Sequence, residues 1–204
     1  MYIPKVFEQA DSASLIKLVK DFPFATLIAS SNDGLEAEHL PMYMDDGVLQ
    51  GHVAKGNPFW QRIAEGSDVM AIFQGANSYI SPSYYPSKQR DGKVVPTWNY
   101  LVVHVKGKIK YKHEASWKLS MLTRLTDLHE TRKSMPWQVC DAPQDYLVNM
   151  LSALVGIEIH IESMAGKWKV SQNQSVENKQ GVVDGLAQEE SLSASLMSSI
   201  VGAS

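Results

Sequence analysis

The feature of this sequence that most limits its fold is a series of short strand-like segments separated by tight-turn signals. Phe24–Ser31 is mostly apolar, and Asn32-Asp33-Gly34 follows it as a tight turn. About seven such segments occur along the chain, and no regular strand–helix–strand alternation is present. This pattern favours an antiparallel β-barrel or sandwich with peripheral helices over a doubly wound parallel sheet.

Periodicity, turn signals and cap signals predict the individual elements. Strands are predicted at residues 24–31, 35–44, 48–54, 69–73, 94–112, 156–164 and 167–172, with an irregular loop at 74–86 and a turn at Ala165-Gly166. Helices are predicted at residues 12–22, 58–65, 114–130 and 143–154, the last one capped by Asp141. We expect one domain over residues 1–175. A C-terminal extension, residues 176–204, is expected to be helical and to pack on the domain or on a dimer partner.

The composition is that of a globular chain and argues against several specialised functions. Of 204 residues, 44% are hydrophobic, which is enough for a folded core. The formal net charge is −3, so direct binding to the DNA backbone is not supported by charge. The single cysteine, Cys140, cannot form an intrachain disulfide, and no run approaches the roughly 20 apolar residues of a membrane span. We expect a cytoplasmic protein that does not associate with membranes.

Several common catalytic and ligand-binding motifs are absent. The sequence contains no G-x-G-x-x-G, no P-loop and no G-x-S-x-G. Its six histidines are scattered, and one cysteine cannot build a structural zinc site, so no metal site is expected. No residue can be assigned a catalytic role from the sequence.

One strand–turn–helix segment has the chemistry of an anion site. A predicted strand carrying His52, Val53 and Ala54 leads through a turn containing Lys55 into a helix for which Asn57 is a good N-cap. The free N–H groups and dipole of a helix N-terminus favour an anion, and a lysine adds a full positive charge. A phosphate group is the ligand that this arrangement favours. The alternative is an ordinary capped helix with a solvent-facing lysine.

Aromatic, amide and hydroxyl side chains are concentrated at residues 74–86 and 95–100, which include Trp98 and Asn99. Such a mixture suits a flat heteroaromatic ligand with a polar edge. The alternative is that these tyrosines and tryptophans only stabilise an irregular loop.

A late predicted strand carries two lysines. On a strand, Lys167, Lys169 and Ser171 share one face, while Trp168 and Val170 share the other. A face with two lysines and a serine could contact an anion. A solvated edge strand protected by lysines is the alternative.

Seven short motifs run in order along the chain and together resemble one family. They are Met1-Tyr2-x-Pro4-x-x-Phe7, Phe22-Pro23-Phe24-Ala25-Thr26, His39-Leu40-Pro41, Gly51-His52-Val53-Ala54-Lys55-x-Asn57-Pro58, Tyr79-Ile80-Ser81-Pro82-Ser83-x-Tyr85, Val95-Pro96-Thr97-Trp98-Asn99-Tyr100 and Lys167-Trp168-Lys169-x-Ser171-Gln172-Asn173. The chain resembles the PaiB-type FMN-binding negative transcriptional regulators over nearly its whole length, up to about residue 191.

This resemblance implies a mainly β, α+β fold: an antiparallel split β-barrel of Greek-key type with peripheral helices, as in the pyridoxamine phosphate oxidase superfamily. It also implies a homodimer with FMN at the two-fold interface, where both subunits contribute. Lys55 and Lys169 would be the phosphate cations. The residues implied to bind FMN are His52, Val53, Ala54, Lys55, Asn57, Trp98, Asn99, Lys167, Lys169, Ser171 and Gln172.

Three functions remain open at this point. The resemblance implies a transcriptional regulator that acts through the redox state of its flavin. An FMN-dependent oxidoreductase of an unidentified small molecule is the second, with the flavin doing the chemistry and His52 as a candidate proton shuttle. A haem-handling split barrel, with a histidine as axial ligand, is the third.

Overall fold

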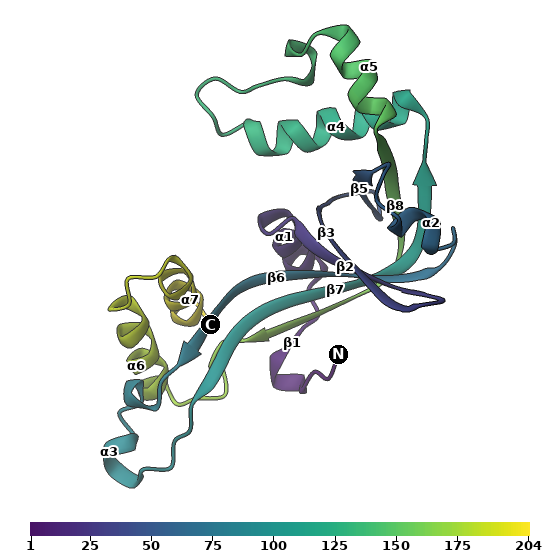
Figure 1. Ribbon diagram of the computed structural model, residues 1–204. Helices are drawn as coiled ribbons and strands as arrows, with labels where there is room; N and C mark the ends of the chain where they lie inside the picture. Colours follow the sequence, from purple (N-terminus) through teal and green to yellow (C-terminus); the bar gives the residue numbers. More distant parts are fainter. The chain divides into compact units, whose positions relative to one another are not determined.

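Eight strands and seven α-helices make up the computed structural model, which describes residues 1–204 (Figure 1). The strands are β1 (Glu8–Gln9), β2 (Phe24–Ser31), β3 (Gly34–Pro41), β4 (Tyr43–Asp45), β5 (Val48–Ala54), β6 (Asp68–Ile80), β7 (Thr97–Lys112) and β8 (Leu154–Lys169). The helices are α1 (Ser12–Asp21), α2 (Phe59–Arg62), α3 (Lys88–Asp91), α4 (Ala115–Glu130), α5 (Gln144–Ser152), α6 (Val176–Ala187) and α7 (Leu192–Gly202). Three short 3-10 helices are η1 (Lys5–Phe7), η2 (Pro82–Tyr84) and η3 (Val139–Asp141).

All eight strands belong to one open sheet. They follow the order β3-β2-β6-β7-β8-β5-β4, and β1 pairs with β8 off this path. The pairs β2–β3, β2–β6, β4–β5, β5–β8 and β1–β8 are antiparallel. The predicted class, an antiparallel α+β split barrel with peripheral helices, is confirmed. None of the helices combines the length and the apolar character that crossing a membrane requires.

Strands β2 and β5 have the predicted limits, but one predicted strand is in fact two. Residues 35–44 form β3 and β4, which are interrupted at Met42. The amide of Met42 donates to the backbone oxygen of Pro23 at 2.9 Å instead of joining a strand pair, and its side chain is fully buried. The chain therefore changes direction at a core residue that carries no turn signal.

Two strands continue through glycines that we interpreted as loop or turn residues. Strand β6 reaches Ile80 instead of ending before a loop at residues 74–86, and β8 runs through the predicted turn at Ala165-Gly166. A Cβ on Gly75 would lie 3.1 Å from the Leu18 side chain, and one on Gly166 would overlap the Leu15 side chain. Both glycines therefore mark the close approach of α1 to a strand, not a change of chain direction.

The helix predicted at residues 143–154 is also corrected. Helix α5 begins at Gln144 with Pro143 at its N-cap. The Asp141 carboxylate accepts the amide of Gln138 at 2.8 Å, so it closes η3 and does not cap α5. In contrast, Asp11 caps the start of α1, because its carboxylate accepts the amide of Ser14 at 2.8 Å.

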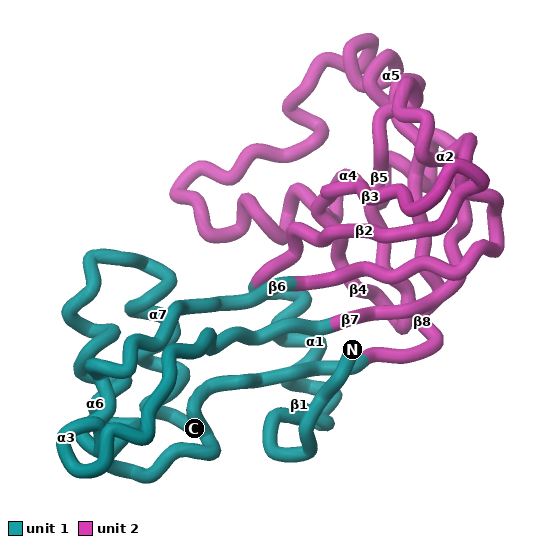
Figure 2. Tube along the Cα trace, turned by 60° about the horizontal axis from the view of Figure 1, so that its bottom comes forward, with its two compact units in different colours: residues 1–21, 74–103, 165–204 teal, residues 22–73, 104–164 magenta.

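The chain divides into two compact units, which Figure 2 distinguishes by colour. Unit 1 contains residues 1–21, 74–103 and 165–204, and unit 2 contains residues 22–73 and 104–164. Strands β6, β7 and β8 contribute residues to both units. The predicted boundary between a domain at residues 1–175 and an extension at residues 176–204 stays a prediction.

In unit 2, helix α4 is fixed to the sheet by an apolar cluster and a polar contact. Met121 and Leu125 are buried against Tyr43 of β4, with Trp117 packed at the edge of this cluster. The indole N–H of Trp117 also donates to the Glu158 carboxylate on β8 at 2.9 Å. These contacts place the N-terminal turn of α4 firmly against the sheet.

In unit 1, helix α6 packs against the segment that follows β6. Gly181 and Gly185 face Tyr84, because a Cβ at either position would overlap Tyr84 atoms. The Tyr84 hydroxyl donates to the Glu189 carboxylate, and this hydrogen bond raises the pKa of Tyr84 to about 12. The C-terminal helices thus hold the tyrosine-rich segment near η2.

Replacing Gly156 with alanine should destabilise the protein by about 1–3 kcal/mol, because the new methyl group would overlap the Trp117 ring in a packed interior. Urea denaturation measures this change. Gly56→Ala is the matched control, since no atom lies within 4 Å of a Cβ built there. Its effect should stay within about 0.5 kcal/mol. Equal losses in both variants would contradict the packing described here.

Candidate functional site

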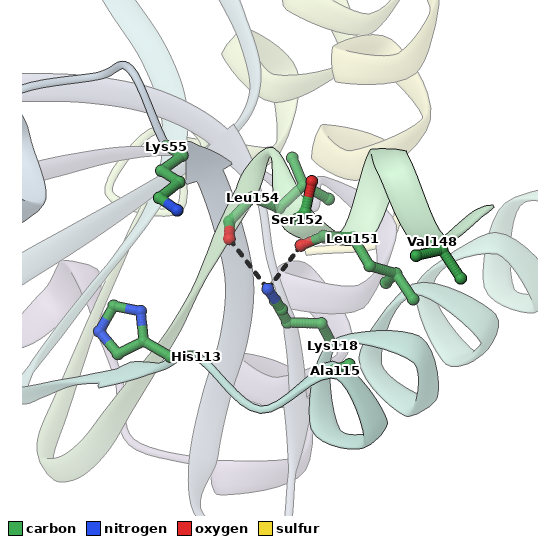
Figure 3. A pocket seen from close by; sticks show the side chains of 8 residues that line it. All are labelled: Lys55, His113, Ala115, Lys118, Val148, Leu151, Ser152 and Leu154. Atoms are coloured by element: carbon green, nitrogen blue, oxygen red, sulfur yellow. Dashed lines mark hydrogen bonds between the residues drawn. The ribbon is translucent and has the colours of Figure 1, made fainter. Parts of the chain in front are cut away.

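Unit 2 contains a hollow at the place where the turn after β5 meets helices α4 and α5 (Figure 3). Its volume is about 380 Å³. Three of the lining side chains can carry a positive charge, and no carboxylate is among them. The lining residues are Lys55, His113, Ala115, Lys118, Val148, Leu151, Ser152 and Leu154. Basic groups within mostly apolar walls make the hollow suitable for a small anion.

The backbone of Lys55 is held on both sides. Its amide donates to the backbone oxygen of Ala153 at 2.7 Å, and its own carbonyl oxygen accepts the indole N–H of Trp60 at 2.9 Å. The Trp60 ring in turn meets the His113 ring edge-on, with centroids 5.6 Å apart. The fixed backbone directs the Lys55 side chain into the hollow.

The turn provides fewer free amides than the sequence predicts. The amide of Asn57 donates to the oxygen of Ala54 at 2.9 Å, and the Asn57 side chain accepts the amide of Phe59 at 2.8 Å. Helix α2 has only four residues, with Pro58 at its N-cap, so the helix predicted at residues 58–65 was too long. Side chains, more than a helix N-terminus, therefore supply the positive charge of the hollow.

Lys118 and His113 line the hollow, although the sequence analysis did not single them out. Lys118 is only 5% exposed, and its ammonium donates to the backbone oxygens of Leu151 and Leu154. It precedes the buried Met121 by three residues on α4, which puts it on the apolar face of that helix. A lysine in that position is the one signal that could have identified it.

The other predicted residues of unit 2 do not line the hollow. Val53 is 6% exposed and belongs to the core, while Ala54 pairs with Leu154 at the end of β5. Burial lowers the pKa of His52, and its Nδ1 atom is buried without a hydrogen-bond partner. Of the predicted cofactor-binding residues in this unit, only Lys55 faces the hollow.

The remaining predicted residues lie in unit 1, where Tyr79, Trp98 and Lys169 form what we call the aromatic–lysine surface. The Trp98 side chain is 53% exposed and meets the Tyr79 ring edge-on, with centroids 6.2 Å apart. The Lys169 ammonium donates to the oxygen of Trp98 at 2.7 Å and to the Thr97 hydroxyl. Burial and, to a smaller extent, the charge of Lys167 lower the pKa of Lys169.

Lys167 is occupied by interactions within unit 1. Its ammonium lies 5.3 Å from the centre of the Tyr100 ring and 6.0 Å from that of Tyr2. It also donates to the backbone oxygen of Tyr2 at 3.2 Å. Two aromatic faces therefore already stabilise its charge.

Asn99, Ser171 and Gln172 also use their side chains inside the protein. The Asn99 amide donates to the Ser171 hydroxyl at 2.9 Å, and the Gln172 amide donates to the oxygen of Trp168 at 2.6 Å. Strand β8 ends at Lys169, and Ser171 has φ 65°, so Ser171 does not share a strand face with the lysines as predicted. These residues shape the segment that follows Lys169.

The predicted site residues thus form two groups, one at the hollow of unit 2 and one at the aromatic–lysine surface of unit 1. Hydrogen bonds fix the side chains of Asn57, Lys118, Asn99, Lys169 and Gln172, whereas His52 Nδ1 is buried without a partner. No group of three or more His, Cys, Asp or Glu side chains is arranged to hold a metal ion.

Comparison with known proteins assigns the family. Residues 1–163 match the family described as "Putative FMN-binding domain". The chain belongs to this family. One relative, the "Protease synthase and sporulation protein PAI 2" of Bacillus subtilis (strain 168), is 30% identical to this chain over 205 residues. The alignment covers 98% of this chain and 96% of the relative. The PaiB-type resemblance and FMN as the cofactor are thereby confirmed.

Two solved structures share the fold of this FMN-binding family member. The FAD and haem binding protein from Mycobacterium smegmatis aligns with a TM-score of 0.60 at 15% identity, covering 79% of this chain and 73% of that chain. The flavocytochrome Anf3 from Azotobacter vinelandii aligns with a TM-score of 0.59 at 11% identity, covering 82% and 72%. At such identities the likeness concerns the fold alone.

Each group, taken by itself, has the chemistry that one part of FMN requires. A phosphate monoester carries a charge of about −1.5 to −2 at neutral pH, and the hollow offers Lys55 and Lys118 without a competing carboxylate. A flat heteroaromatic ring matches exposed aromatic side chains such as Tyr79 and Trp98. When bound, FMN supplies hydride and electron transfer, and the protein supplies binding and orientation.

Acidification should destabilise the protein partly through His52. Because burial lowers the pKa of folded His52, the unfolded chain binds more protons as the pH falls below about 6.5, and the free energy of unfolding falls with it. Urea denaturation at pH 7 and pH 5 should therefore show a smaller loss in His52→Gln than in the wild type. His104→Gln must be measured alongside, since burial also lowers the pKa of His104. An NMR titration that places the His52 midpoint above 6.5 would contradict this reasoning.

Proposed function

We propose that this protein is a homodimer that binds FMN with the phosphate in the hollow of unit 2. One observation carries the proposal: Lys55, His113 and Lys118 line a hollow whose walls contain no carboxylate. A phosphate monoester would find both the charge and the hydrogen-bond donors that it needs there. Family membership supports FMN as the molecule that carries this phosphate.

The second subunit is proposed to contribute to the flavin site through its aromatic–lysine surface. Tyr79 and Trp98 present exposed rings suited to the flavin, and the half-buried Lys169 adds a positive charge. The family resemblance supports this arrangement, since it implies an FMN site at a two-fold interface. Light scattering in solution should accordingly give twice the mass of one chain.

The protein is proposed to act through the redox state of its flavin. The name of the relative, a protease synthase and sporulation protein, supports a regulatory role more than a metabolic one. An FMN-dependent oxidoreductase of an unidentified small molecule is the second candidate, because a bound FMN supplies hydride and electron transfer. The cytoplasmic location stays a prediction.

FMN titration tests the proposed site directly. Purified protein should bind FMN, and Lys55→Ala and Lys169→Ala should each weaken binding by about 1.5–3 kcal/mol, the range for hydrogen bonds to a charged group. Quenching of flavin fluorescence measures the affinities. Lys110→Ala is the control, because Lys110 is exposed on β7 and does not line the hollow. Wild-type affinity in both lysine variants would refute the site.

A gel shift on promoter DNA separates direct from indirect regulation. With a net charge of −3, we expect no binding that weakens steeply with salt. Tight binding that loses affinity by orders of magnitude between 50 and about 200 mM salt would show direct contact with the DNA backbone. The comparison should be made with the flavin oxidised and with it reduced.

A further inference from the structure

Lys118 has an environment that a purely structural lysine does not need. The residue is 5% exposed, and no carboxylate lies within ion-pairing distance of its ammonium. Burying an ammonium without an opposite charge is costly, so the position is expected to serve an interaction that repays this cost. An apolar residue would fill the same place on the buried face of α4.

Capping of α5 explains only part of this arrangement. Lys118 donates to the oxygen of Leu151, in the last turn of α5, and to that of Leu154, at the start of β8. Lysine side chains commonly satisfy such carbonyl groups at helix ends. However, an ammonium has three N–H donors, and these two bonds leave one donor and the whole positive charge without a partner at the wall of the hollow.

Lys118 and Lys55 are also connected through one short segment. Lys118 holds the carbonyl groups of Leu151 and Leu154, and the carbonyl group of Ala153 between them accepts the Lys55 amide at 2.7 Å. His113 reaches the same hollow from the end of β7, where its ring meets Trp60. Three basic groups from separate parts of the chain are thereby placed around one space.

We infer that Lys118 and His113 bind the phosphate group together with Lys55, and that Lys118 is the buried cation that makes the site select phosphorylated flavin. The inference rests on the proposed function, because it assigns further residues to the same site. The phosphate supplies the opposite charge that Lys118 lacks, and the weakly polar walls of the hollow strengthen the attraction. Riboflavin, which lacks the phosphate, gains nothing from either residue.

The ratio of FMN affinity to riboflavin affinity tests this assignment. In Lys118→Met we expect FMN binding to weaken about 10- to 100-fold, the effect of losing a charged hydrogen-bond donor, and riboflavin binding to change less than about 2-fold. Lys110→Met is the matched control, which removes one exposed lysine of the same unit and should leave both affinities unchanged. Equal losses for FMN and riboflavin in Lys118→Met would overturn the inference.

A double variant separates direct contact from an effect through Lys55. If Lys118 touches the phosphate, Lys118→Met should lower the FMN-to-riboflavin ratio further in a Lys55→Ala background. No further loss in that background would mean that Lys118 only positions the Lys55 turn, and the inference would be wrong. If the wild type binds neither flavin, the proposed function itself fails, and this inference fails with it.

If Lys118→Met does not fold, the variant His113→Gln provides a second test of the shared phosphate site. His113 is exposed, so His113→Gln should fold normally, which circular dichroism can check. We expect it to weaken FMN about 2- to 10-fold and to leave riboflavin unchanged, since the substitution removes the ring N–H that would donate to the phosphate. An unchanged ratio in folded His113→Gln would count against the shared phosphate site.

Discussion

The hydrogen bond from the Lys55 amide to the Ala153 oxygen is the interaction on which the candidate site depends. It continues the pairing of β5 with β8 one residue beyond Ala54 and Leu154, into the turn that carries Lys55. The position of Ala153 depends in turn on α5, whose last turn is held by Lys118. The hollow therefore exists because α4 and α5, which lie between β7 and β8 in the sequence, are fixed to the end of β5. That connection holds the turn that carries the exposed Lys55 beside α5.

Sequence reasoning located the strands best where local signals at both ends agree. Strand β5 lies between an Asp-Asp-Gly turn and the Lys55 turn, and its predicted limits are those observed. Strand β6 was predicted too short and β8 was predicted as two separate strands, because Gly75 and Gly166 carry the same local signal as a turn. What decides their role is the side chain of Leu18 or Leu15 on α1, which is distant in the sequence. A single sequence contains no information on such a contact, so the distinction could not be made.

The same limit applies to the site. Lys55 could be predicted because its strand–turn–helix context is local, whereas Lys118 and His113 join it only through the packing of α4 and α5. The family resemblance implies that Asn99 and Ser171 bind FMN, which stays a prediction, and the structure adds that their side chains form a hydrogen bond with each other. Local sequence shows that a side chain can form hydrogen bonds, but tertiary structure determines its partner. The hydrogen bond between Asn99 and Ser171 therefore shapes the segment after Lys169, which local sequence alone did not predict.

The distribution of charge also limits the kind of ligand. The chain as a whole is slightly acidic, so it has no long-range attraction for a polyanion such as DNA. The hollow of about 380 Å³ nevertheless brings Lys55, His113 and Lys118 together without a carboxylate, whereas the charge of Lys167 is satisfied by the rings of Tyr2 and Tyr100. A local cluster of basic groups attracts a compact anion at short range, where salt screens the attraction least. A flavin phosphate suits such a site, because its charge sits on one small terminal group and its remaining surface is suited to aromatic contacts.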